Sequence, residues 1–172
     1  EAEGHAEESV ARAARGRTDF RGDLVLTIDP EDAKDHDDAL SIHGDPERGS
    51  CVVGIHIADV THYVRPATAL DREARARGCS VYLADRVLPM LPHSLSSGLC
   101  SLSEGADRLT LSVLATLEPD GSLRDTRIVE GVIRSAASLS YGEAARRLRE
   151  EGGAVSSALR ALDRLAGGLR GR

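Results

Sequence analysis

The sequence of 172 residues predicts an α+β domain. Strand-like runs dominate up to about residue 135 and helical spacing follows them, an order typical of α+β proteins. The runs 109–117 and 122–135 flank Glu118-Pro119-Asp120-Gly121, which has the composition of a hairpin turn. Because 41% of the residues are apolar, the chain can fill a core, although only 2% are aromatic.

The N-terminal part of the chain predicts three core strands. Residues 1–18 are polar and rich in Ala, Glu and Arg, which indicates a helix or a linker. Apolar runs then predict strands at 24–28 and 39–43, on either side of an acidic loop. The β-branched run 51–58 follows a turn at 45–49 and predicts a central strand.

The middle of the chain alternates between a helix and extended segments. Helical spacing appears at 69–78, where Asp71 and Glu73 suit a first turn. A short strand is predicted at 80–83. Residues 87–92 are expected to be extended, because each of their two prolines fixes φ and disfavours helix in the residue before it.

Two helices are predicted at the C-terminal end, at 141–151 and 155–169, separated by Gly152-Gly153. Charge is uneven along the chain, with a balance of −10 over residues 1–120 and +4 over residues 121–172. The total of −6 argues against a protein that coats nucleic acid through its own positive charge. The net charge does not exclude an enzyme that binds phosphates through metal ions.

The cysteines and the hydropathy pattern indicate a cellular setting. Cys51, Cys79 and Cys100 form no CxxC pair and no zinc spacing, so we interpret them as reduced thiols of a cytoplasmic protein. No apolar run approaches the roughly 18 residues that a membrane span needs. The chain begins at Glu1 rather than Met and ends in helical sequence, so we expect a fragment of a longer protein.

An acidic loop is the most informative segment of the sequence. Asp29, Asp35, Asp37 and Asp38 lie within ten residues between two apolar runs, and Lys34 is the only lysine of the chain. Crowded carboxylates repel one another and are relieved by protonation, by basic partners or by a divalent cation. Oxygen donors suit Mg²⁺. The alternative is a solvated turn, since Asp is common in turns and at helix N-caps.

Several motifs, in the same order, resemble the ribonuclease II / ribonuclease R family, the RNB catalytic domain, and ribonuclease R most closely. The matching segments are 27–40, His56-Ile57-Ala58-Asp59-Val60, Ser80-Val81-Tyr82-Leu83, Pro89-Met90-Leu91-Pro92, Leu99-Cys100-Ser101-Leu102, Asp107-Arg108-Leu109 and Ser138-Leu139-Ser140-Tyr141. The resemblance implies a mixed or antiparallel sheet with flanking helices. It also implies that residues 19–172 are the N-terminal half of the catalytic domain, which is therefore incomplete.

The resemblance further implies a 3′-to-5′ exoribonuclease that hydrolyses single-stranded RNA to nucleoside 5′-monophosphates with Mg²⁺-assisted attack of water. Residue by residue, Asp29, Asp35, Asp37 and Asp38 match the metal-binding aspartates, which could hold two ions. Asp29 and Asp38 would be the first-choice metal ligands. Asp37 matches the aspartate most closely tied to catalysis, and Asp35 would help to hold the second metal or its water. Because the four aspartates share metal ions and charge, no separate role is assigned to any one of them.

Two tyrosines match RNA-binding positions of the family. Tyr82 would pack on RNA near the cleavage site, although a core tyrosine in a strand is the alternative. Tyr141 would lie in the path of the nucleic acid, or would cap the core at a helix start. His36 stands where the family often has an apolar residue, and its charge could tune the site near neutral pH.

Other polar residues near the motifs are interpreted more plainly. His56 and His62 lie in strand-like sequence and are expected to be structural, and so is Asp59 at a strand end. Arg86 and Arg108 could contact phosphates or simply lie in solvent.

The resemblance also raises alternatives to an active enzyme. The family's later arginines and its flanking cold-shock and S1-type domains are expected only in a longer protein, so the 172 residues alone are expected to be inactive. A truncated, catalytically incompetent RNA-binding fragment or paralogue is the alternative function. A third possibility is a protein that binds divalent cations without nuclease activity.

Overall fold

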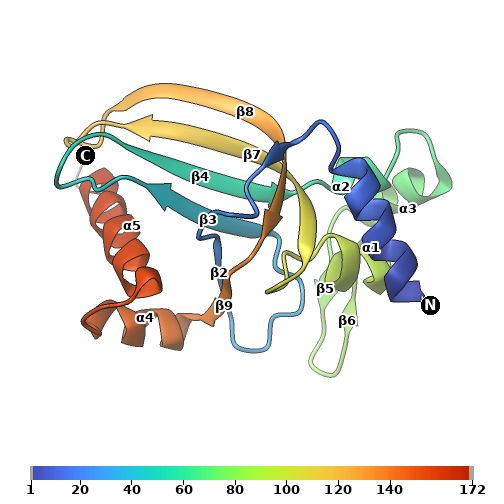
Figure 1. Ribbon diagram of the computed structural model, residues 1–172. Coiled ribbons are helices and arrows are strands. Elements are labelled where there is room, and N and C mark those ends of the chain that lie inside the picture. The colour runs from blue at the N-terminus through green and yellow to red at the C-terminus, as the bar shows by residue number, and fades with distance from the viewer. Residues whose placement is uncertain (1, 171–172) are drawn as a thin grey trace.

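A seven-stranded sheet forms the centre of the computed structural model, which describes residues 2–170 and the side chains of residues 8–170. Its order is β1-β8-β7-β4-β3-β2-β9 (Figure 1). The strands are β1 (Thr18–Asp19), β2 (Leu26–Asp29), β3 (Asp38–His43), β4 (Cys51–Ala58), β7 (Asp107–Leu117), β8 (Leu123–Arg134) and β9 (Ala137–Ser140). A separate hairpin pairs β5 (Val81–Tyr82) with β6 (Val87–Leu88).

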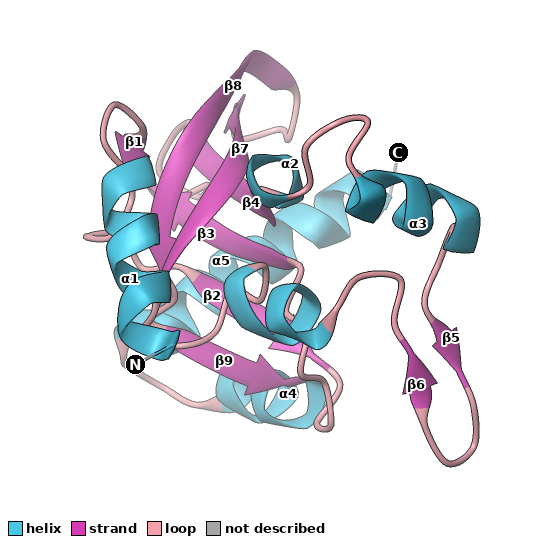
Figure 2. Ribbon diagram, turned by 90° about the vertical axis from the view of Figure 1, so that its right-hand side faces the viewer, coloured by secondary structure: helices cyan, strands magenta, loops and turns pink. Residues whose placement is uncertain are grey.

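The helices are α1 (Ala2–Ala13), α2 (Val60–Tyr63), α3 (Ala69–Arg77), α4 (Tyr141–Arg149), α5 (Ala154–Arg170) and the π-helix η1 (Leu95–Leu99). Helices α4 and α5 lie together beside one face of the sheet (Figure 1). An apolar cluster of Leu26, Leu139, Ala144 and Leu159 joins them to β2 and β9. Figure 2 shows the β5–β6 hairpin standing apart from the main sheet.

Pairing within the sheet confirms the predicted α+β fold with a mixed sheet and flanking helices. The strands from β2 through β3, β4 and β7 to β8 pair antiparallel. Strand β1 runs parallel to β8 at one edge, and β9 runs parallel to β2 at the other. The hairpin predicted around 118–121 joins β7 to β8, and Gly121 takes a positive φ of 77° in its turn.

The elements with strong local signals form where they were predicted. The central strand spans Cys51–Ala58 as expected, and α3 begins at Ala69, after Thr68 accepts a hydrogen bond from the Asp71 amide as N-cap. Helix α4 begins at a capping box in which Ser140 and Glu143 satisfy each other's backbone amides. Local signals were therefore sufficient for these elements.

Four short elements were not predicted: β1, α2, η1 and β9. Strands β1 and β9 exist because distant strands offer them backbone partners, as when Leu26 pairs with Ala137. Helix α2 has only four residues and is capped by Asp59, whose side chain accepts from the His62 amide. Elements of this length carry no periodic signal of their own.

A buried histidine links the central strands of the sheet. His56 is fully buried, with Nε2 3.0 Å from Ser41 Oγ and Nδ1 2.9 Å from Ser112 Oγ. A Cβ at Gly54 would lie 2.7 Å from His56 Nε2, so only glycine leaves room for the ring. The structural role predicted for His56 is therefore confirmed.

We expect His56 to make the protein sensitive to acid. Burial lowers its pKa from 6.5 to about 4, so between these values the unfolded chain binds a proton that the folded chain does not. The free energy of unfolding should fall by up to about 3 kcal/mol as the pH drops through this window, since one pKa unit corresponds to about 1.4 kcal/mol. Urea unfolding of His56→Gln should show a flatter pH profile. A wild-type slope in His56→Gln would show that this histidine does not cause the sensitivity to acid.

The three cysteines are all free, with Cys51 and Cys100 buried and Cys79 exposed. Among residues 2–170, no helix combines the length and the hydropathy needed to cross a membrane.

Candidate active site

The acidic loop connects two neighbouring antiparallel strands. Strand β2 ends at Asp29 and strand β3 begins at Asp38, and Leu26 pairs with Leu40 behind them. Both aspartates therefore lie at the same end of the sheet, and Asp35 and Asp37 lie on the loop between them. The adjacent end of β4 holds the loop through a hydrogen bond from the Ala58 amide to the Asp37 carbonyl, 2.9 Å.

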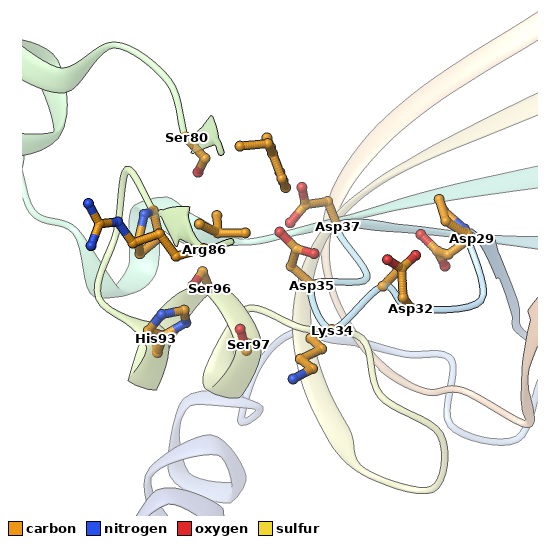
Figure 3. Close-up of a pocket in the computed structure, with 15 residues that line it drawn as sticks. Asp29, Asp32, Lys34, Asp35, Asp37, Ser80, Arg86, His93, Ser96 and Ser97 are labelled. Carbon is orange, nitrogen blue, oxygen red and sulfur yellow. The ribbon is translucent and has the colours of Figure 1, made fainter. Parts of the chain in front are cut away.

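A cavity of about 730 Å³ opens beside this loop. One wall is acidic and includes Asp29, Asp32, Asp35 and Asp37. The opposite wall comes from the β5–β6 hairpin, the segment that leads into η1 and η1 itself (Figure 3). Its polar residues are Ser80, Arg86, His93, Ser96 and Ser97. Carboxylates on one wall of the cavity therefore face hydroxyl and basic groups on the other wall.

The structure brings four of the six predicted site residues to this cavity. Asp29, Asp35, Asp37 and Tyr82 line it. Asp38 does not line it, although it lies next to Asp37 at the start of β3. Tyr141 lies outside it as well, 62% exposed at the first turn of α4. The roles assigned to these six residues stay predictions.

Electrostatic coupling links the aspartates. Loss of hydration raises the pKa of Asp37, and the negative charges of Asp35, Asp38 and Asp29 raise it further. Tyr82, whose side chain is 68% exposed, has its pKa raised first by the charge of Asp35 and also by a hydrogen bond to it. The site therefore concentrates negative potential that a cation would neutralise.

The donor set of this wall fits Mg²⁺, because it consists of carboxylate oxygens. However, no group of three His, Cys, Asp or Glu side chains within the described residues is arranged to hold a metal ion. One Asp29 oxygen, Oδ2, is engaged by His36 Nδ1 at 2.7 Å (a side-chain contact within the loop). The four-aspartate ligand set and a pair of ions stay predictions, and side-chain rotation would be needed to complete them.

Neighbouring polar residues divide between the cavity and the framework. Arg86 lines the cavity, whereas Arg108 donates to the carbonyls of Ser101 and Asp107 and is used inside the protein. Asp59 has the structural role that was predicted, because it pairs with Arg17 at 2.7 Å and caps α2. His62 packs edge-on against the neighbouring tyrosine ring.

One residue that supports the site gave no signal of its own in the sequence. Ser101 belongs to the segment Leu99-Cys100-Ser101-Leu102, to which the resemblance assigns no role. Its hydroxyl bonds to the backbone of the acidic loop. The loop is 65 residues away from Ser101 in the chain. Only the tertiary structure, which brings the two together, could have identified this residue.

In this chain, a mixed sheet presents an aspartate-rich loop between two adjacent strands. A family model described as RNB domain matches residues 17–172, and the chain belongs to this family. This confirms the resemblance found in the sequence.

Individual relatives agree with the family assignment. The chain is 51% identical over 126 residues to Ribonuclease R of Thermotoga maritima, covering 73% of this chain and 18% of that protein. The solved structure of Mycoplasma genitalium RNase R in complex with double-stranded RNA superposes with a TM-score of 0.84 at 28% identity, covering 95% of this chain and 29% of that one. The chain therefore spans less than a third of these relatives.

Similarity alone does not decide whether a relative is active. Two Arabidopsis thaliana proteins, named DIS3-like exonuclease 2 and Inactive exonuclease DIS3L2, are both 51% identical to this chain over 138 residues. Each match covers 80% of this chain and 13% of the relative. Activity therefore depends on the residues of the site and not on overall similarity.

Proposed function

We propose that this chain carries the catalytic aspartates of a 3′-to-5′ exoribonuclease that acts on single-stranded RNA and releases nucleoside 5′-monophosphates. The observation that carries the proposal is the cavity in which Asp35 and Asp37 face a wall with Arg86 and His93. Membership of the RNB family supports it. Relatives that are named ribonucleases and a relative solved with RNA support it further.

Residues on the two walls of the cavity would have different roles. Asp29, Asp35, Asp37 and Asp38 would hold Mg²⁺, which when bound would lower the pKa of a water molecule and neutralise charge on phosphate oxygens. The exposed ring of Tyr82 would stack against a base beside Asp35, a contact that tolerates any sequence. Arg86 would offer positive charge to the RNA backbone across the cavity.

As part of the same proposal, the complete protein would add flanking cold-shock and S1-type domains that feed RNA to the cavity. We also propose a cytoplasmic location, which the three free cysteines support because thiols persist in reducing compartments. The 172 residues by themselves are proposed to be inactive, since the family's later phosphate-binding arginines would be needed for the reaction.

A second candidate is a catalytically incompetent RNA-binding protein. The lack of a ready metal-ligand arrangement in the described residues favours it, and one relative at 51% identity is named as inactive. The presence of Asp29, Asp35, Asp37 and Asp38 speaks against decay of the site.

The experiment that separates the two candidates uses the full-length protein that contains this chain. We expect it to shorten a 5′-labelled RNA with a single-stranded 3′ tail and to release nucleoside 5′-monophosphates, only when Mg²⁺ is present. Addition of EDTA should stop the reaction, and DNA of the same sequence should persist. If the full-length protein binds this RNA but does not shorten it at any Mg²⁺ concentration, the result supports the second candidate instead.

A further inference from the structure

We infer that Ser101 is a positioning residue that sets the direction in which Asp35 and Asp37 point. The inference rests on the proposed function, because it assigns Ser101 a role in metal binding by those aspartates. It starts from the geometry of one buried hydroxyl group and the two peptide groups that it joins.

The side chain of Ser101 is fully buried and bonds to both sides of Asp35. Its Oγ donates to the Lys34 carbonyl oxygen at 3.1 Å and accepts from the His36 amide at 3.1 Å. These are the backbone groups immediately before and after Asp35. A single side chain therefore fixes the path of the backbone through this aspartate.

Two neighbouring hydrogen bonds extend the same restraint. The Leu102 amide donates to the His36 carbonyl at 2.8 Å, and the Ala58 amide donates to the Asp37 carbonyl at 2.9 Å. Residues from two other segments therefore make hydrogen bonds to the backbone groups on both sides of Asp35 and of Asp37. The loop cannot shift at these aspartates without breaking bonds to the rest of the domain.

Ser101 is itself held from behind. Arg108 Nε donates to the Ser101 carbonyl at 2.8 Å, and Arg108 lies on β7 in the main sheet. The Ser103 hydroxyl donates to Ser101 Oγ at 3.3 Å, so the hydroxyl has one acceptor and two donors and is fully satisfied. The restraint therefore connects the acidic loop to the rigid part of the fold.

Removal of the hydroxyl should loosen the aspartates more than it weakens the fold. In Ser101→Ala, the Lys34 carbonyl and the His36 amide lose their buried partner, and the loop must relax to satisfy them. The carboxylates of Asp35 and Asp37 would then sample more directions. Loss of a group that orients metal ligands typically weakens metal affinity about 10–100-fold.

The test compares Ser101→Ala with Ser135→Ala in the full-length protein. Ser135 is also buried, and its hydroxyl donates to the Ala137 carbonyl at 3.2 Å, away from the acidic loop. We expect similar losses of melting temperature in both variants. Only Ser101→Ala should raise the Mg²⁺ concentration for half-saturation, by about tenfold or more, in calorimetric titration. Its His36 and Leu102 amides should also exchange hydrogen faster.

Equal Mg²⁺ half-saturation in the two serine variants would overturn the inference. Where Ser101→Ala does not fold, Ser101→Cys is measured instead, since a thiol of similar size is only a weak hydrogen-bond partner, and unchanged Mg²⁺ binding overturns the inference again. Asp37→Asn separates this failure from failure of the proposed function. If Asp37→Asn removes Mg²⁺-dependent trimming while Ser101→Ala binds Mg²⁺ normally, only the positioning role is wrong.

Discussion

Replacement of Asp37 by Asn should lower the rate of RNA trimming by the full-length protein at least about 10²-fold, the usual size of a lost charge-stabilising group. Asp37 lines the cavity, and the charges of Asp35, Asp38 and Asp29 act on it directly. The amide keeps the size of the side chain and removes its charge, so the fold should persist. The rate is measured by release of mononucleotides at saturating RNA.

The same variant should be more stable than the wild type at neutral pH without Mg²⁺. The pKa of Asp37 is raised, so its ionised form is less favourable in the folded chain than in the unfolded chain. The resulting destabilisation appears as the pH rises through the ordinary carboxylate range and is complete above the folded pKa. Asp37→Asn should therefore unfold at a higher urea concentration than the wild type at pH 7, and the difference should vanish in acid.

Asp32→Asn is the matched control for both measurements. Asp32 lines the same acidic wall but is not one of the four predicted ligands. It should keep most of the trimming activity. Full activity of Asp37→Asn would contradict a catalytic role for Asp37. Equal losses in both variants would show that negative charge at this wall, rather than a specific ligand set, matters.

Replacement of Arg17 by Met should cost about 3–5 kcal/mol in the free energy of unfolding, the usual result of leaving one partner of a buried ion pair uncompensated. Arg17 Nη2 lies 2.7 Å from Asp59 Oδ2, and both side chains are only 7% exposed. Arg17 also donates to the Thr110 carbonyl at 3.3 Å. Urea unfolding at pH 7 measures the loss.

The pH dependence of this effect has a definite sign. Burial opposes ionisation of Asp59, but hydrogen bonds from Thr61 and Arg17 outweigh it and hold the pKa of Asp59 below its usual value. Its contribution to stability is therefore present above the ordinary pKa of Asp and is lost as the pH falls through the lowered value. The gap between wild type and Arg17→Met should narrow in acid.

The control for Arg17 is an ion pair within α3 in which the arginine is exposed, although the Asp71 side chain is only 17% exposed. Arg75 Nε lies 3.0 Å from Asp71 Oδ1, and the arginine side chain is 75% exposed. Arg75→Met should cost no more than about 0.5 kcal/mol, since exposed pairs on helices contribute little. If both arginine variants unfold at the same urea concentration, burial of the Arg17 pair contributes nothing to stability.

Local signals in the sequence were sufficient for the regular elements with long periodic patterns. The strand at 51–58, the hairpin around Gly121 and the helix from Ala69 all follow from residue spacing and turn composition. The acidic loop was also visible, because four aspartates between two apolar runs stand out in a single segment. These features depend only on neighbours in the chain.

Contacts between distant segments lay beyond the sequence. Strand β9 forms because β2 offers a parallel partner, and the opposite wall of the cavity, with Arg86 and His93, comes from a segment about fifty residues after the aspartates. Arg108 was considered as a phosphate ligand, and the structure shows it bound to the Ser101 carbonyl. The sequence showed which chemical groups each residue carries, but it did not show which distant residue each group contacts.

By itself, the sequence determined the family, the positions of the main strands along the chain and the presence of a crowded acidic loop. Spacing, turn composition and charge are local properties that survive without the fold. Only the tertiary structure decided that Asp38 and Tyr141 lie outside the cavity while Ser101 holds the backbone around Asp35. The reason is physical: the direction of a side chain is set by hydrogen bonds and packing from residues that are remote in the chain.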